Sequence, residues 1–284
     1  MTSTLELIKA CAEIPCFSSY EDRIHPFIQE LVSRCEGAEL IHIPDNNLLI
    51  RVPGREDVAP VALSAHLDKI DHFIAEGTPE NPPESLPVSI SKTEIIGQMD
   101  DTVGLGMALS LMLQSSHENF PTLYLFLSEM EESYGLKKHP ERLRNGGEGM
   151  HAGMGAERIS AYVLKHLPLP SRVITIDTTP LFRGEPGLAL YSKHWEKNGL
   201  EPSEELIQST TLLEQRVVAL EPEVRLTNNT NDYLHYGKCL NQQSQAIPCV
   251  AVEPAIFPYH QKDERVFLKD IERTEVIVKD LINA

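Results

Sequence analysis

The chain has 284 residues, 41% of them apolar, which is enough to build a substantial folded core. Its formal net charge is −17, from 42 acidic and 25 basic residues, and this charge argues against nucleic acid or an anionic membrane as a partner. The N-terminus carries no signal-peptide pattern, no apolar run is long enough to cross a bilayer, and the five cysteines form no C-x-x-C pair. We therefore expect a cytoplasmic protein with reduced thiols.

The first third of the chain is predicted to form helices followed by strands. Apolar residues at helical spacing indicate a helix over 3–14, which Pro15 ends. Ser18 and Glu21 have the spacing of a capping box for a second helix. Two short strands are expected over 40–44 and 47–52, joined by turn residues. The apolar run over 60–68 then predicts a buried strand.

The middle of the chain alternates strands with one apolar helix. A proline-rich loop over 76–87 precedes a strand pair or edge strand over 88–96. Asp100 and Asp101 lie in a glycine-containing turn before an apolar helix over 103–113, where an aspartate commonly caps the helix. The run over 122–127 predicts a further buried strand.

The last part of the chain continues the alternation. Strands are expected over 172–177, 188–191, 217–220 and 247–252, and helices over 156–166, 203–213, 232–240 and 266–281. Alternating strands and helices predict an α/β fold around a largely parallel sheet. No break in composition marks a second core, so we expect one domain over 1–284.

Several predicted strands end in side chains that can bind metal. Sites in α/β sheets form outside the carboxyl ends of the strands, so these side chains should meet there. Each one alone has an ordinary structural explanation, but their joint occurrence favours a metal site. His66 and Asp68 point to one face of a strand, so the aspartate could orient the imidazole. A bridging aspartate could hold two cations ~3.5–4 Å apart. The side chains in question are His66, Asp68, Glu131, Glu132, Asp177 and His260.

The ordered set of motifs resembles the co-catalytic di-zinc exopeptidases, and most closely the glutamyl and deblocking (tetrahedral-type) aminopeptidases. The resemblance runs nearly end to end, and its specificity lies in the order of the motifs. The N-terminal stretch 14–21 is also similar to the opening region of that family. The matching motifs are His66-Leu67-Asp68, Met99-Asp100-Asp101-Thr102-Val103-Gly104, Glu131-Glu132, Gly153-Met154-Gly155-Ala156, Ile176-Asp177-Thr178-Thr179-Pro180, Asn231-Asp232-Tyr233 and Tyr259-His260-Gln261-Lys262-Asp263-Glu264.

The resemblance implies a three-layer α/β/α sandwich around a mixed, largely parallel sheet, and a role for each motif residue. His66, Asp100 and Asp177 would bind one divalent metal ion. Glu132 and His260 would bind a second, with Asp100 bridging the two. Zinc is the expected metal, with cobalt or manganese as alternatives.

The remaining motif residues would serve catalysis and substrate. The resemblance implies that Asp68 orients His66 and that Glu131 is the general base. It places Asp232 near the substrate amine, and His151 could approach the substrate from its loop. The family often has a cis peptide after the bridging aspartate, which would lie at Asp100–Asp101.

Two departures from the family pattern stand out. Only residues 69–99 separate the His-x-Asp and Asp-Asp motifs, too few for the separate lid domain that such aminopeptidases carry. A loop over 134–153 follows the two glutamates and contains four basic residues, which suggests either a substrate-facing loop that meets a carboxylate or a solvated insertion. We therefore expect a domain without an inserted lid or dimerisation domain, in which large tetrahedral assembly is in question.

We expect a hydrolase that removes N-terminal residues from peptides. Three alternatives remain open: an N-acyl-amino-acid deacylase or carboxypeptidase of the same superfamily, a one-metal acyltransferase on the same fold, and a non-catalytic metal-binding assembly protein. The expected partners are a peptide or acylated amino acid, and a further copy of the chain in a homo-oligomer.

Overall fold

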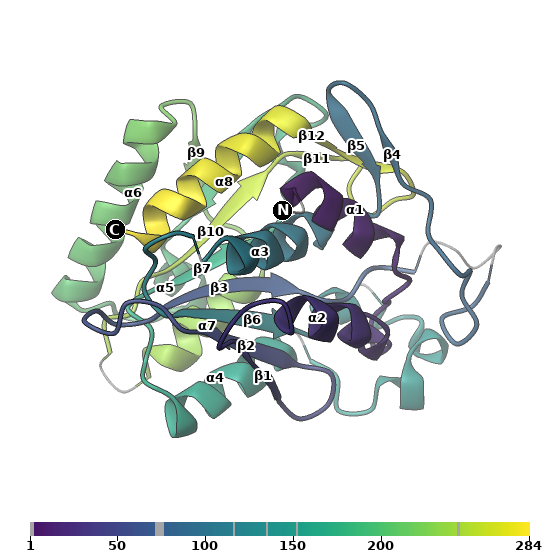
Figure 1. The fold of residues 1–284 in the computed structure, drawn as a ribbon, viewed down its shortest axis with the longest axis horizontal. Coiled ribbons are helices and arrows are strands. Elements are labelled where there is room, and N and C mark those ends of the chain that lie inside the picture. Colours follow the sequence, from purple (N-terminus) through teal and green to yellow (C-terminus); the bar gives the residue numbers. More distant parts are fainter. Residues whose placement is uncertain (1–2, 72–76, 116, 135, 152, 243–244) are drawn as a thin grey trace.

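A central eight-stranded sheet organises the molecule (Figure 1). The computed structural model describes residues 3–71, 77–115, 117–134, 136–151, 153–242 and 245–284. Residue 76 of the predicted proline-rich loop and residues 135 and 152 of the predicted basic loop therefore lie outside the described residues. In spatial order the sheet contains β1 (Glu39–His42), β2 (Leu48–Val52), β6 (Leu123–Ser128), β3 (Val61–His66), β7 (Val173–Ile176), β10 (Cys249–Pro254), β8 (Leu188–Tyr191) and β9 (Arg225–Thr227).

The centre of this sheet is parallel and its edges are mixed. Strands β6, β3, β7 and β10 run parallel to one another. The β1–β2 and β2–β6 pairs are antiparallel, as is the β10–β8 pair, whereas β9 runs parallel to β8. The four parallel strands are buried along their whole length, as expected for strands covered on both faces.

Helices cover both faces of the sheet, which confirms the predicted three-layer α/β/α sandwich (Figure 1). Helices α1, α3 and α8 pack over one face, and α4 and α7 over the other. Two large apolar clusters lie between these layers and the sheet. The helices are α1 (Thr4–Glu13), α2 (His25–Val32), α3 (Thr102–Gln114), α4 (Met154–His166), α5 (His194–Asn198), α6 (Glu204–Leu220), α7 (Asp232–Leu240) and α8 (Leu268–Ile282).

A second, four-stranded sheet lies at the N-terminal end of α8 (Figure 1). The sequence did not predict how its strands pair. The predicted strand pair over 88–96 is the hairpin of β4 (Ser89–Ile90) and β5 (Glu94–Gly97). Strand β12 (Glu264–Phe267) pairs with β5, and β11 (Ile256–Phe257) completes the sheet. The pairing places Glu264 opposite Gly97, three residues before Asp100.

Two local expectations are wrong. The predicted strand over 217–220 is the last turn of α6, because this helix buries Leu206, Thr210, Leu213 and Val217 at helical spacing. Ser18 does not cap α2; its hydroxyl donates to Asp68. A capping box does form at Ser3 and Glu6, where it starts α1.

Helix α3 packs unusually close to its neighbours because it contains two glycines. A Cβ at Gly104 would collide with the carbonyl oxygen of Ile176 on β7. A Cβ at Gly106 would lie 2.6 Å from the backbone of Ile8 in α1. These contacts fix the start of α3 against the sheet. Among the described residues, no helix has the length and apolarity required to cross a membrane.

Candidate active site

Histidine and carboxylate side chains from four parts of the chain, all of types that can bind metal, meet at the carboxyl ends of the parallel strands. His66 is the last residue of β3, and Asp177 follows β7 directly. Glu131 and Glu132 follow β6, and Asp100 lies just before α3. All these strands point the same way, so their ends share one edge of the sheet. The structure thus brings the predicted ligands together from distant parts of the sequence.

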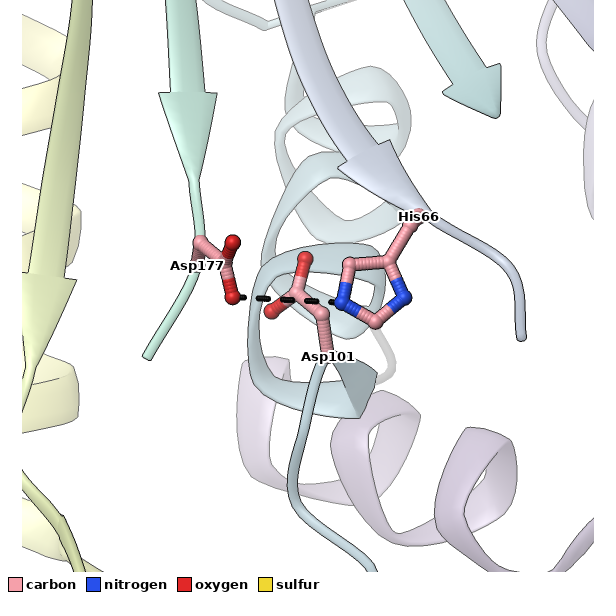
Figure 2. Close-up of side chains that lie close together, drawn as sticks. All are labelled: His66, Asp101 and Asp177. Atoms are coloured by element: carbon pink, nitrogen blue, oxygen red, sulfur yellow. Dashed lines mark ion pairs between the residues drawn. The ribbon is translucent and has the colours of Figure 1, made fainter. Parts of the chain in front are cut away.

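His66, Asp101 and Asp177 form one compact group (Figure 2). Nε2 of His66 lies 3.9 Å from Oδ1 of Asp177 and 3.4 Å from Oδ1 of Asp100. In the figure, Asp101 projects toward the other two side chains from the start of α3. A potential ligand atom of each of the three lies within 4.8 Å of the others, and all three residues are buried.

His260 and Glu132 form the other side of the site, with Asp100 between the two groups. Nε2 of His260 lies 3.1 Å from Oε1 of Glu132 and 3.5 Å from Oδ2 of Asp100. Asp100 therefore directs Oδ1 toward His66 and Oδ2 toward His260. This is the arrangement that a carboxylate shared by two cations requires.

The Asp100–Asp101 peptide bond is cis, as the resemblance predicts. Asp101 also caps α3, because its Oδ1 accepts the backbone N–H of Gly104 at 2.8 Å. Its Oδ2 is buried and has no hydrogen-bond partner. On the other side of the turn, Oε2 of Glu264 accepts the backbone N–H groups of Met99 and Asp100. The turn that carries Asp100 is therefore fixed from both sides.

The turn that carries Glu131 and Glu132 is held by two buried carboxylates. Asp68 accepts the backbone N–H of Glu131 through Oδ1 and that of Glu132 through Oδ2, each at 3.0 Å. Glu21 accepts the backbone N–H of Met130 at 3.0 Å. Met130 has a φ of 61°, a left-handed conformation that is uncommon for a non-glycine residue. Both carboxylates thus stabilise a strained turn in front of the two glutamates.

The ring of His66 is oriented by Asp68 in a way that the sequence did not specify. Nδ1 of His66 lies 2.9 Å from the backbone carbonyl oxygen of Asp68 and 3.5 Å from its carboxylate Oδ1. An N–H at Nδ1 can donate to this carbonyl, which leaves Nε2 as the nitrogen that faces Asp100 and Asp177.

The proximity of these groups shifts their pKa values strongly. Burial and neighbouring carboxylates raise the pKa of Asp177 and that of Glu131 well above the usual range. The same two causes raise the pKa of Glu132. Burial opposes the charging of His260, but the carboxylates of Asp100 and Glu132 outweigh burial and raise its pKa to about 11. Burial alone would raise the pKa of Asp100, yet the two histidines lower it.

The donor set fits divalent cations. Within the described residues, no lysine or arginine forms an ion pair with Asp100, Glu132 or Asp177. Buried carboxylates without a compensating charge are strongly unfavourable, and two divalent cations would supply that charge. The buried, unpartnered Oδ2 of Asp101 also lies beside this group. Imidazole and carboxylate ligands suit zinc, and carboxylates also suit manganese.

A narrow polar cavity opens onto the site, and most of its wall was not predicted. Its volume is about 20 Å³, room for about one water molecule. Of the predicted site residues, Asp100, Glu131 and Asp177 line it. The sequence signals that could have indicated other lining residues are the charged residue inside the apolar run 249–254 and the polar triplet before α7. These other lining residues are Thr178, Pro180, Tyr191, Asn229, Thr230, Asn231, Glu253 and Tyr259.

The two predicted substrate residues differ in position. Asp232 is buried at the start of α7, and the hydroxyl of Ser128 donates a hydrogen bond to its Oδ2. Burial raises the pKa of Asp232. His151 is exposed, and its Nε2 lies 2.8 Å from Oε2 of Glu157 in α4. Its ring contacts Glu157 at the start of α4 and the backbone oxygen of Gly149, rather than the carboxylate cluster.

The arginines of the predicted basic loop contact acidic groups of the chain itself. Arg142 donates to the backbone oxygen of Asp71 at 2.6 Å and lies 3.3 Å from its carboxylate. Arg144 stacks on Tyr20 and pairs with Asp22 at 3.0 Å. The described part of the loop thus contacts both the segment between α1 and α2 and the segment that follows β3.

Solved structures of peptidases share this architecture. No protein-family model matches the sequence, and no curated protein matches it either. An aminopeptidase from the archaeon Desulfurococcus kamchatkensis is similar with a TM-score of 0.67 and 16% identity, over 98% of this chain and 94% of that one. A TET aminopeptidase from a marine sediment archaeon of the Thaumarchaeota is similar with a TM-score of 0.68 and 14% identity, over 98% and 95%. The TET1 peptidase of Pyrococcus horikoshii is similar with a TM-score of 0.65 and 15% identity, over 99% of both chains. The chain therefore shares the α/β/α fold of these peptidases, as the resemblance of its sequence motifs predicts.

Proposed function

We propose that this chain is a metal-dependent exopeptidase, an aminopeptidase that releases N-terminal residues from peptides. One observation carries the proposal: Asp100 lies between two imidazoles, with its oxygens 3.4 Å from His66 and 3.5 Å from His260. Aminopeptidases among the structurally similar proteins support the reaction class.

The proposed metal ligands are those that the resemblance implies, and the proximity of these side chains supports them. His66, Asp100 and Asp177 would hold one divalent cation, and Asp100, Glu132 and His260 a second, with zinc expected and cobalt or manganese as alternatives. When bound, such a pair of cations polarises a carbonyl and lowers the pKa of water. Asp101 caps α3, lies close to His66 and Asp177, and would supply further negative charge there.

Glu131 is the proposed general base. It lines the cavity together with Asp100 and Asp177, and Asp68 fixes its backbone. Burial raises the pKa of its carboxyl, which brings the group closer to the pH at which a base is most effective. Glu131 would accept a proton from the attacking water and then deliver it to the nitrogen of the leaving group.

We further propose that residues 1–284 form a single catalytic domain without an inserted lid. The substrate class would be peptides or related amides. The TET1 peptidase of Pyrococcus horikoshii assembles into a tetrahedron or a large octahedral shell, which supports a homo-oligomer of this chain as well. Asp232 would contribute negative charge close to Glu131 and His66. A direct role of His151 would require it to leave Glu157.

The test is a substrate panel run on protein loaded separately with Zn²⁺, Co²⁺ and Mn²⁺. Aminoacyl-anilides should be hydrolysed, and N-acyl-amino acids should not. Hydrolysis of N-acyl-amino acids alone would replace the aminopeptidase with a deacylase. Absence of any turnover in protein that holds two metal ions would favour a non-catalytic binding role.

A further inference from the structure

Glu253 is a buried carboxylate that the proposed chemistry does not use. It lies on β10 and is 1% exposed. Val252 is in register with Ile176 of the parallel strand β7, so Glu253 lies beside Asp177, one strand further from His66. Residues in register on neighbouring strands project to the same side. Glu253 therefore extends the row of acidic groups past the proposed metal ligands.

Hydrogen bonds hold this carboxylate in the wall of the cavity. Nδ2 of Asn231 donates to Oε1 of Glu253 at 2.5 Å. Oδ1 of the same asparagine accepts the backbone N–H of Tyr233 at 2.9 Å and so caps α7. Tyr191 is hydrogen-bonded to Thr179 at 2.7 Å and lines the same cavity. Asn231 therefore fixes Glu253 at a defined place rather than neutralising it.

A negative charge on Glu253 would have no positively charged side chain paired with it among the described residues. In the part of the chain that the structure describes, no lysine or arginine forms an ion pair with it. Two divalent cations held by Asp100, Asp177 and Glu132 would balance those carboxylates, but Glu253 lies outside both proposed ligand sets. A buried carboxylate in this position is unfavourable unless a cation joins it. The cavity is where such a cation can arrive, because Glu253 and Glu131 both line it.

We propose that Glu253, positioned by Asn231, binds the α-ammonium group of the substrate's first residue. The inference rests on the proposed aminopeptidase function and names the group that would select a free amino terminus. In a peptide substrate, one carbon atom separates the α-ammonium from the scissile carbonyl. If that carbonyl lies at the proposed metal site, a carboxylate next to Asp177 is close to the position of the ammonium. The cavity volume of about 20 Å³ suits a compact ammonium group and not the longer side chain of lysine or arginine.

The experiment compares two hydroxamates that differ only in this ammonium group. Alanine hydroxamate carries it, and propionohydroxamate lacks it; both can bind metal through the hydroxamate. Isothermal titration on Zn²⁺-loaded protein measures both affinities without requiring turnover. We expect wild-type protein to prefer alanine hydroxamate by about tenfold or more, the size of one charge-assisted hydrogen bond. In Glu253→Gln the preference should fall to near unity, and propionohydroxamate should bind as in wild type.

The control variant is Glu221→Gln, which removes a carboxylate paired with Arg273 at the end of α6 and should keep the full preference. Equal binding of both hydroxamates to wild-type protein would overturn the proposal, whether or not the variant folds. An unchanged preference in folded Glu253→Gln would overturn it as well, while leaving the aminopeptidase intact. Failure of wild-type protein to bind either hydroxamate would instead overturn the proposed metal centre, and the ammonium subsite with it.

Discussion

Oδ1 of Asp68 accepts the backbone N–H of Glu131 at 3.0 Å. The other carboxylate oxygen, Oδ2, accepts the N–H of Glu132 at 3.0 Å and the hydroxyl of Ser18 at 2.6 Å. Asp68 thus connects the end of β3 with the turn after β6, and it controls the proposed base and one proposed ligand at the same time. Its link to His66 runs mainly through its backbone carbonyl.

Replacing Asp68 should therefore impair the glutamate turn more than the histidine. In Asp68→Asn, the amide NH₂ would face one of the two N–H donors, which would leave that donor unpaired. We expect kcat to fall by about 10–100-fold, the range found when groups that orient a metal ligand are removed. Steady-state kinetics with an aminoacyl-anilide provide the measurement. Ser18→Ala removes only one of the three donors and should reduce kcat far less; equal losses in both variants would contradict this assignment.

Substitution of the proposed base should separate metal binding from turnover. Glu131→Gln keeps the shape of the side chain but cannot accept a proton. We expect kcat to fall by about 10²–10⁴-fold, the usual contribution of a general base. Elemental analysis should show the same metal content as in wild-type protein. A variant that retains most of its activity would show that another group takes the proton.

Loss of one imidazole should abolish the two-metal centre. Wild-type protein is expected to hold about two divalent cations per chain, the content of a co-catalytic site. His260→Ala removes the group that lies 3.1 Å from Glu132 and should lose at least one of them, together with activity. His151→Ala is the matched control, because His151 is exposed and pairs with Glu157. Two bound cations in His260→Ala would exclude this histidine as a ligand.

The stability of metal-free protein should fall as the pH rises. Burial and the charge of Asp100 raise the pKa of Glu264 to about 8, above the ordinary 4.5. An acid with a raised pKa in the folded state stabilises the fold below its unfolded pKa, and this stability is lost as the pH rises through the folded value. His260, with a pKa of about 11 against 6.5, acts in the same direction above pH 6.5. The opposite shift of Asp100 contributes a constant amount above pH 3.8.

Bound metal should reverse this trend. Cations displace protons from their ligands, so metal affinity rises with pH. Thermal unfolding of chelator-treated and Zn²⁺-loaded protein between about pH 5 and pH 9 measures both effects. We expect the difference in Tm between the two forms to widen as the pH rises. A difference that stays constant over this range would contradict a ligand set made of these acids and histidines.

The sequence predicts the ends of the parallel strands well, because buried strands have a simple signature. Apolar runs that stop at His66 and Asp177 place both side chains at one sheet edge, whatever the details of the loops. The prediction of a strand over 217–220 is wrong because two adjacent valines favour a strand locally. The packing of Val217, one turn after Leu213, outweighs that preference in α6.

The sequence could not predict the contacts between segments that lie far apart in the chain. Glu264 bonds the backbone of Asp100 only because β12 pairs with β5, and these short strands are far apart in the sequence. Glu253 follows directly after the predicted strand over 247–252, and its importance depends on the register of β10 with β7, which places it beside Asp177. Such relationships become visible only when the sheet order is known.

The close contact between Gly106 and Ile8 has a consequence for the integrity of the whole protein. Helix α1 packs directly against α3, and α3 begins immediately after the aspartate pair. A proteolytic cut between α1 and α2 would remove none of the proposed ligands. It would allow α1 to dissociate from α3, and the turn that carries the two aspartates would lose this support. Metal retention would therefore report on the packing of α1 against α3, although α1 contains none of the proposed metal ligands.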